Sequence, residues 1–107
     1  MAKTITIAGR KIGEGQPAFI VTEVSANHSQ KLENAIAIIK AAKAAGVDAI
    51  KLQTYTPDTI TIDSRKKWFF VGGEQNKDNP EIWHGKTFHD LYKDAYTPWE
   101  WHAELQR

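Results

Sequence analysis

The spacing of apolar and polar positions changes several times along the chain, and the first change marks a hairpin. Between residues 4 and 13 polar and apolar side chains alternate around Ala8-Gly9-Arg10, which predicts two antiparallel strands joined by a tight turn. Gly13, Gly15 and Pro17 then end this pattern. We therefore treat residues 1–17 as an N-terminal hairpin that precedes the main unit, residues 18–107.

The next segment predicts a strand and a helix in succession. Residues 18–24 form a nearly continuous apolar run, typical of a strand that is buried on both faces, and only Glu23 interrupts it near its end. After a turn at residues 25–30, apolar residues recur three and four positions apart, which predicts a helix over about residues 30–45. We expect Ser29 to be the N-cap and Gly46 to end the helix. The apolar stripe consists of Leu32, Ala35, Ile36, Ile39 and Ala42.

Strand alternation returns at residues 48–53. Ile50 and Leu52 point to one face of this predicted strand, whereas Lys51 and Gln53 point to the other. A strand–helix–strand unit places its two strands parallel and close together, so Glu23, Lys51 and Gln53 converge at the carboxyl end of the sheet. Ligands bind at that end in parallel barrels and open α/β sheets. The alternative to a ligand site is that residues 48–53 form an edge strand whose polar face is exposed to water.

A long irregular region follows, from residue 54 to residue 86. Its aromatic residues argue against disorder and predict that the region docks on the rest of the chain: Trp68, Phe69, Phe70 and Trp83. Phe88, Leu91, Tyr92 and Ala95 then predict a short amphipathic helix. Thr97-Pro98-Trp99-Glu100 reads as a capping box that opens a further helix.

Composition narrows the class of protein. The chain has 107 residues and a net charge of +1, which gives no field that would attract nucleic acid or a membrane surface. It has no cysteine, so disulfides and thiolate chemistry are excluded. The first apolar stretch is too short and too interrupted to predict a signal peptide, and no apolar run approaches the roughly 20 residues that a membrane helix needs. These observations predict a soluble, cytoplasmic protein.

Two parallel strands with one crossover cannot complete a core, because strands buried on both faces need neighbours on each side. We therefore expect this chain to be the amino-terminal piece of a longer protein.

Two stretches carry a specific resemblance. Thr22-Glu-Val-Ser-Ala-Asn-His28 and Ala45-Gly-Val-Asp-Ala-Ile-Lys-Leu-Gln-Thr-Tyr-Thr-Pro-Asp58 resemble the opening of the sialic acid synthase family, and most closely its pseudaminic acid synthase branch. Further similarity lies in residues 55–61, 70–73, 91–92 and 97–102. The resemblance implies the N-terminal portion of a (β/α)8 TIM barrel, incomplete in this chain, with the rest of the barrel and a C-terminal antifreeze-like domain absent.

The resemblance also implies a chemistry. The family condenses phosphoenolpyruvate with an amino-sugar aldehyde to make nonulosonic acids. The resemblance assigns Lys51 to phosphoenolpyruvate binding and Gln53 to sugar binding. It assigns Glu23 to catalysis beside the sugar and the attacking water. Asn27, in the loop after the first strand, is expected to help bind the sugar. A divalent metal, Mn²⁺ or Mg²⁺, is expected in the full-length protein, with its ligands outside this segment. The full-length protein is also expected to be a homodimer.

Other interpretations stay open. Lys51 in a barrel enzyme could form a Schiff base, as class I aldolases do, or the chain could be a non-catalytic fragment whose apolar faces pair with another chain. His28 is expected to pack its loop rather than to act chemically. His84 and His89 are not expected to form a metal-ligand pair, and Asp58 and Asp63 are expected to be turn or surface carboxylates.

Overall fold

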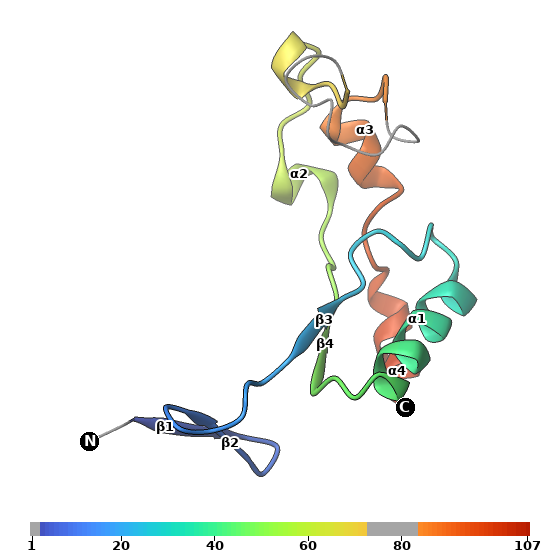
Figure 1. The fold of residues 1–107 in the computed structure, drawn as a ribbon. Helices are drawn as coiled ribbons and strands as arrows, with labels where there is room; N and C mark the ends of the chain where they lie inside the picture. Colours follow the sequence, from blue (N-terminus) through green and yellow to red (C-terminus); the bar gives the residue numbers. More distant parts are fainter. Residues whose placement is uncertain (1–2, 73–83) are drawn as a thin grey trace.

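The computed structural model describes residues 3–72 and 84–107, and the described chain is elongated, 49 × 35 × 24 Å (Figure 1). The elements, in order, are β1 (Thr4–Ile7), β2 (Arg10–Gly13), β3 (Val21–Glu23), α1 (Leu32–Ala44), β4 (Ala49–Lys51), α2 (Pro57–Ile60), the 3-10 turn η1 (Lys67–Phe69), α3 (Phe88–Lys93), the 3-10 turn η3 (Trp99–Trp101) and α4 (His102–Leu105). This mixture confirms the α/β class. The described strands form two separate two-stranded sheets and no closed barrel.

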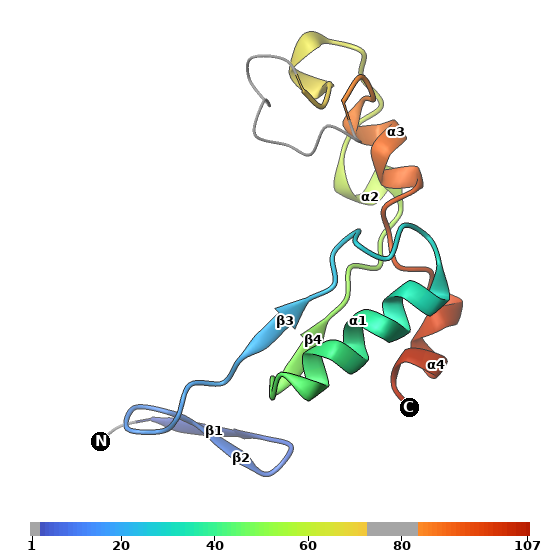
Figure 2. The ribbon, with the colours of Figure 1, turned by 45° about the vertical axis from the view of Figure 1, so that its right-hand side comes forward.

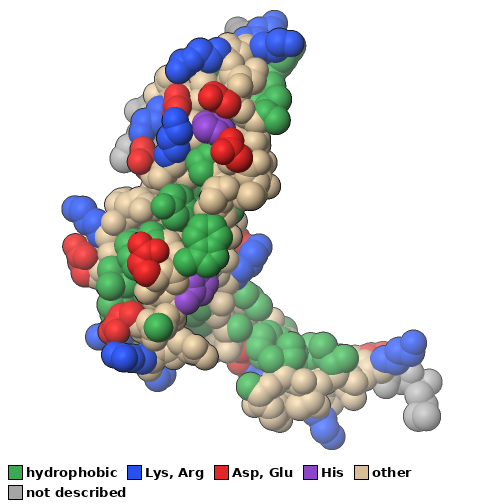
Figure 3. Space-filling view, turned by 180° about the vertical axis from the view of Figure 1, so that it is seen from behind, with side chains coloured by type: hydrophobic (Ala, Val, Ile, Leu, Met, Phe, Trp, Pro, Cys, Tyr) green, Lys and Arg blue, Asp and Glu red, His purple; other side chains and the backbone are tan. Residues whose placement is uncertain are grey.

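The predicted hairpin is confirmed. β1 and β2 pair antiparallel, from Thr4 opposite Gly13 to Ile7 opposite Arg10. The two turn residues, Ala8 and Gly9, have φ of 48° and 80°, the left-handed geometry that matches the twist of hairpin strands. Figure 3 shows hydrophobic side chains gathered over this arm, where Ile5 and Ile7 are exposed. The guanidinium of Arg10 ties the arm to the main unit through an ion pair with Asp48.

The parallel strand pair is also confirmed. β3 and β4 align Val21 with Ala49, Thr22 with Ile50 and Glu23 with Lys51. α1 connects them, and Figures 1 and 2 show α1 and α4 on the same side of the pair. The apolar face of β4 lies toward these helices, because Ile50 and Leu52 share a hollow with residues of both, Ile39 and Leu105.

One expectation about β3 is wrong. The apolar run predicted a strand buried on both faces, but Ile20 is 53% and Val21 49% exposed. In the described residues this sheet has only two strands, so each strand has an open edge and an open face. Val24, just past the strand, is fully buried. Burial on both faces needs neighbouring strands, which this sheet does not have in the described chain.

The predicted helix is present as α1, but its start differs. Ser29 is not the N-cap: Lys31 holds that position, and no side chain caps the helix. Ser29 and Gln30 have φ of 51° and 58°. The chain therefore turns through a left-handed pair before the helix begins, so Ser29 lies two residues before the N-cap position.

Residues 54–72 and 84–97, which we call the excursion, dock beyond the carboxyl ends of β3 and β4 (Figure 1). Its small core consists of Val71, Leu91 and Ala95, against which Ala26 of the loop after β3 also packs. The prediction that the region docks on the rest of the chain holds for the described residues around Val71, but Trp68 is not an anchor, since it is 59% exposed. Trp83 lies outside the described residues. The predicted amphipathic helix is α3.

The predicted capping box at residues 97–100 is wrong. The final helical segment begins instead with η3, whose N-cap is Pro98 and has no side-chain capping bond. Thr97 makes its hydrogen bonds with other segments instead of capping the helix. Its hydroxyl bonds to the His28 ring, and its backbone N–H donates to the Gln53 carbonyl at 2.7 Å. Within residues 3–72 and 84–107, no helix has the length and apolar content needed to cross a bilayer.

Candidate functional site

Glu23 and Lys51 form an ion pair on the open face of the parallel strands. Lys51 Nζ lies 2.8 Å from Glu23 Oε1, and the two side chains are 56% and 55% exposed. The pairing follows from the register, because residues directly opposite each other in adjacent strands point to the same face. Alternation, helix spacing and parallel pairing had predicted that these two groups would converge, and the structure confirms it.

The chain continues from this pair to Gln53, which lies beyond the end of β4. Gln53 lines a hollow of about 280 Å³, whereas Leu52 faces the helix side. The other residues around this hollow are Ser25, Ala26, Tyr55, Val71, Phe88, Leu91, Tyr92 and Ala95. The walls of the hollow are therefore the loop that leaves β3, Gln53 just past the end of β4, and the excursion.

Asn27 is not brought into this arrangement. Its side chain is exposed, and Asn27 is not among the residues that line the Gln53 hollow. Its backbone N–H donates to the Val24 carbonyl at 3.1 Å, which closes the first turn of the loop. The neighbouring residue, His28, is fully buried instead.

His28 joins the loop after β3 to the segment around Thr97. Its Nδ1 accepts the backbone N–H of Gln30 at 3.0 Å, so Nε2 carries the ring proton and donates to Thr97 Oγ1 at 3.1 Å. The Trp101 ring packs edge-on against the imidazole, with centroids 5.2 Å apart. Burial lowers the pKa of His28, so the neutral ring is favoured. The expectation that His28 packs its loop is confirmed.

Aromatic rings line the excursion side of the hollow. Tyr55 meets Tyr92 edge-on at 5.4 Å, and Tyr92 stacks with Phe88 at 6.2 Å. Desolvation by burial, and to a lesser extent the electrostatic effect of Tyr92, raises the pKa of Tyr55 to about 12. The Tyr55 hydroxyl is therefore a neutral hydrogen-bonding group at any physiological pH.

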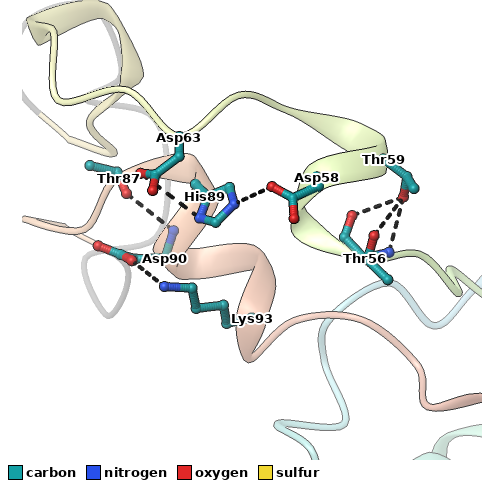
Figure 4. Close-up of polar contacts among 8 residues, drawn as sticks. All are labelled: Thr56, Asp58, Thr59, Asp63, Thr87, His89, Asp90 and Lys93. Carbon is teal, nitrogen blue, oxygen red and sulfur yellow. Dashed lines mark hydrogen bonds and ion pairs between the residues drawn. The ribbon is translucent and has the colours of Figure 1, made fainter.

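A second polar cluster joins α2 to α3 (Figure 4). His89, whose side chain is only 10% exposed, lies between two aspartates: Nε2 is 2.9 Å from Asp58 Oδ1, and Nδ1 is 4.0 Å from Asp63 Oδ1. The carboxylates themselves are 85% and 69% exposed, as expected for surface groups. Their convergence on His89 was not predicted, since residues 58 and 89 are 31 positions apart and no local periodicity reports such a contact.

The described residues do not assemble a metal centre. Among residues 3–72 and 84–107, no three histidine, aspartate or glutamate side chains are grouped so that they could hold a metal ion. In the His89 cluster the two carboxylates face opposite ring nitrogens, so one ion could not contact both of them together with the ring. The divalent metal expected for the full-length protein, with its ligands outside this segment, stays a prediction.

Comparison with known proteins gives several related matches. The pseudaminic acid synthase of Campylobacter jejuni is 47% identical over 87 residues, which cover 81% of this chain and 23% of the relative. That of Helicobacter pylori is 43% identical over 90 residues, covering 84% of this chain and 24% of the relative. The N,N'-diacetyllegionaminic acid synthase of Legionella pneumophila is 40% identical over 48 residues, which cover 45% of this chain and 14% of the relative.

The chain thus spans about a quarter of the length of the two pseudaminic acid synthases that it matches. Residues 38–107, which include β4, Gln53 and the excursion, match the NeuB family model. A match over that share of the chain is enough to assign it: this chain belongs to the NeuB family.

Proposed function

We propose that this chain is the amino-terminal segment of a nonulosonic acid synthase, which condenses phosphoenolpyruvate with an amino-sugar aldehyde. The observation that carries the proposal is the Glu23–Lys51 pair at the carboxyl end of two parallel strands. The relatives named pseudaminic acid synthase support this reaction class. We use "whole synthase" below for the longer protein, which we propose folds as a (β/α)8 barrel whose first two barrel strands are β3 and β4.

Lys51 is proposed to bind phosphoenolpyruvate. That substrate carries a phosphate and a carboxylate, and an ammonium on a rigid strand supplies a fixed positive charge for them. The exposure of Lys51, 56%, leaves room for a ligand beside it in the described chain. Glu23 is then the carboxylate that loses its partner when the anion binds, and this leaves it available to accept a hydrogen bond or a proton.

Glu23 is proposed to act on the water. In the condensation, the C2–C3 π electrons of phosphoenolpyruvate form the bond from C3 to the aldehyde carbon, and the aldehyde oxygen takes up a proton. Water adds to C2, and the bond from C2 to the bridging oxygen breaks as phosphate leaves with that oxygen. A carboxylate within hydrogen-bond reach of that water can take its proton. Gln53 is proposed to hold hydroxyl or amide groups of the sugar, and Asn27, from the loop after β3, to contribute to sugar binding.

The divalent metal, Mn²⁺ or Mg²⁺, would polarise the aldehyde carbonyl when bound. Its ligands are proposed to lie on later strands of the whole synthase, and the synthase is proposed to work as a homodimer. Because groups that act as a unit are not additive, a partial set does not give partial activity. The 107-residue chain alone is therefore expected to release no phosphate.

The test is steady-state phosphate release by the whole synthase as both substrate concentrations are varied. Lys51→Ala is expected to abolish turnover and to weaken phosphoenolpyruvate binding in direct titration, whereas Gln53→Ala is expected mainly to raise KM for the sugar. Lys11→Ala, an exposed lysine of β2, is the matched control and should behave as the parent. Unchanged phosphoenolpyruvate affinity in Lys51→Ala would remove the assignment of that lysine.

A trapping experiment distinguishes the proposed condensation from the alternative in which Lys51 forms a Schiff base. Borohydride added during turnover would fix a covalent adduct on Lys51 if a Schiff base formed. The proposed condensation predicts full recovery of unmodified protein by mass spectrometry.

A further inference from the structure

The pairing of β3 with β4 ends before the chain reaches Gln53. The last aligned residues are Glu23 and Lys51, and the Lys51 carbonyl accepts the Val24 N–H at 3.1 Å. Gln53 lies beyond this ladder. Lys51 and Gln53 are therefore held in place by different parts of the molecule, although only Leu52 separates them along the chain.

The far end of the excursion holds the backbone of Gln53. The Thr97 N–H donates to the Gln53 carbonyl at 2.7 Å, and the Thr54 hydroxyl donates to the Thr97 carbonyl at 2.8 Å. The two segments are thus bonded at successive positions. Because the peptide unit is planar, a fixed carbonyl limits the directions in which the Gln53 side chain can leave the backbone. The placement of that side chain therefore depends on Thr97.

Thr97 is in turn fixed by His28. Both residues are fully buried, and His28 Nε2–H donates to Thr97 Oγ1 at 3.1 Å. The other ring nitrogen, Nδ1, accepts the Gln30 N–H at 3.0 Å, and the Trp101 ring packs edge-on against the imidazole. The ring is thus held on three sides. Thr97 cannot shift without leaving a buried donor unpaired, which is costly.

We propose that Thr97, fixed by His28, is a positioning residue that places the Gln53 amide against the sugar. The inference rests on the proposed function, in which Gln53 binds that substrate. Thr97 acts only through the Gln53 backbone, whereas Lys51 is held by the strand ladder, so phosphoenolpyruvate binding does not depend on Thr97. A misplacement of about 1 Å can cost about 100-fold in rate, so the loss of one bond at this joint is measurable.

The experiment is a double-mutant cycle in the whole synthase, built from Thr97→Val, Gln53→Ala and the double variant. Thr97→Val keeps the shape of the side chain and removes the acceptor of the His28 Nε2–H. It is expected to raise KM for the sugar by about 10-fold and to leave phosphoenolpyruvate affinity in direct titration unchanged. In the Gln53→Ala background the same change is expected to add nothing to KM, because the group that Thr97 places is already gone.

Two further variants separate positioning from general loosening of the excursion. Thr97→Ser keeps the hydroxyl and should bring KM for the sugar back to that of the parent. Thr87→Val is the matched control, since Thr87 is also a buried threonine of the excursion, 1% exposed, and its hydroxyl accepts the Asp90 N–H at the start of α3. Any change that Thr87→Val makes in KM should be the same with and without the Gln53 side chain.

A second cycle covers the case in which Thr97→Val does not fold. Thr54→Val removes the bond to the Thr97 carbonyl from the other side of the joint, and it is expected to behave as Thr97→Val does. A rise in sugar KM that disappears in the Gln53→Ala background, with unchanged phosphoenolpyruvate affinity, supports the positioning role.

The remaining outcomes distinguish the two proposals. A rise that persists in full without the Gln53 side chain, an equal loss of phosphoenolpyruvate affinity, or an unchanged KM in both Thr97→Val and Thr54→Val overturns the positioning role and leaves the condensation intact. An unchanged sugar KM in Gln53→Ala alone removes the sugar assignment of Gln53, and the role of Thr97 with it. Absence of phosphate release by the parent enzyme overturns the proposed function instead.

Discussion

Two polar pairs connect distant parts of this chain, and they differ in almost every physical respect. Glu23 and Lys51 are charged, more than half exposed and on an open face of the sheet. His28 and Thr97 are neutral, fully buried and 69 residues apart. Exposed ion pairs contribute little to stability, whereas an unsatisfied buried group is costly. The buried pair therefore holds the excursion in place, whereas the exposed pair adds little to stability and is free for the role in substrate binding that we propose for it.

The buried pair has additional support around it. Gln30, which donates its N–H to His28, also donates its side-chain amide to the Tyr96 carbonyl. The Thr54 hydroxyl donates to the Thr97 carbonyl at 2.8 Å. Three segments thus meet at one joint: the loop after β3, the start of the excursion at Thr54, and its end at Tyr96 and Thr97. The position of the Gln53 hollow depends on this joint, since its walls include the same loop and the excursion.

The largest effect is expected from Thr97→Val. This change keeps the shape of the side chain and removes the acceptor of the His28 Nε2–H, which leaves a buried donor unpaired at a cost of about 1–3 kcal/mol. Hydrogen exchange in the whole synthase should show faster exchange at Gln30 and Trp101, where the joint opens. Thr4→Val, on exposed β1, is the control and should stay within about 0.5 kcal/mol of the parent. Equal exchange in both variants would contradict the role of the joint.

The same joint should open in acid without any mutation. The pKa of His28 is lowered by burial from its ordinary value of 6.5, so below that pH the unfolded segment binds a proton that the folded joint does not. Stability is therefore complete above about pH 6.5 and falls as the pH is lowered toward the folded pKa. Exchange at Gln30, corrected for its intrinsic pH dependence, should rise over that interval. A His28→Gln variant should lose this part of the pH dependence.

A smaller effect is expected where α2 meets α3. Asp58→Ala removes the acceptor of the His89 Nε2–H, but Asp58 is 85% exposed, so water can replace it and the cost is about 0.5–1 kcal/mol. Asp63→Ala is the matched control, because its carboxylate is 4.0 Å from Nδ1, beyond hydrogen-bond reach. Exchange in α2 should increase in the first variant only. A larger effect from Asp63 would mean that Nδ1 carries the proton.

Sequence periodicity predicted one of the two pairs and could not predict the other. Alternation in β3 and β4, with a helical spacing between them, is enough to place Glu23 and Lys51 at the same end of the sheet, because a strand–helix–strand unit sets its two strands parallel. The register that puts them directly opposite each other comes from the structure. Thr97 carried a strong local signal for a helix cap, yet its hydroxyl bonds to His28. A tertiary partner overrode the local preference. Such a contact has no period and no fixed spacing, so only the fold reveals it.

The smallest effect on stability is expected at the exposed pair, and it provides the sharpest test of the comparison. Glu23→Gln and Lys51→Met each break an ion pair that is more than half exposed, so each should change the free energy of local opening by no more than about 1 kcal/mol. Neither change leaves an unpaired buried group, because water reaches both positions. Hydrogen exchange in β3 and β4 should therefore match that of the parent, while phosphate release is lost in Lys51→Met. If these variants instead destabilised the strands as much as Thr97→Val destabilises the joint, the pair would be structural and its assignment to phosphoenolpyruvate and water would lose its physical basis.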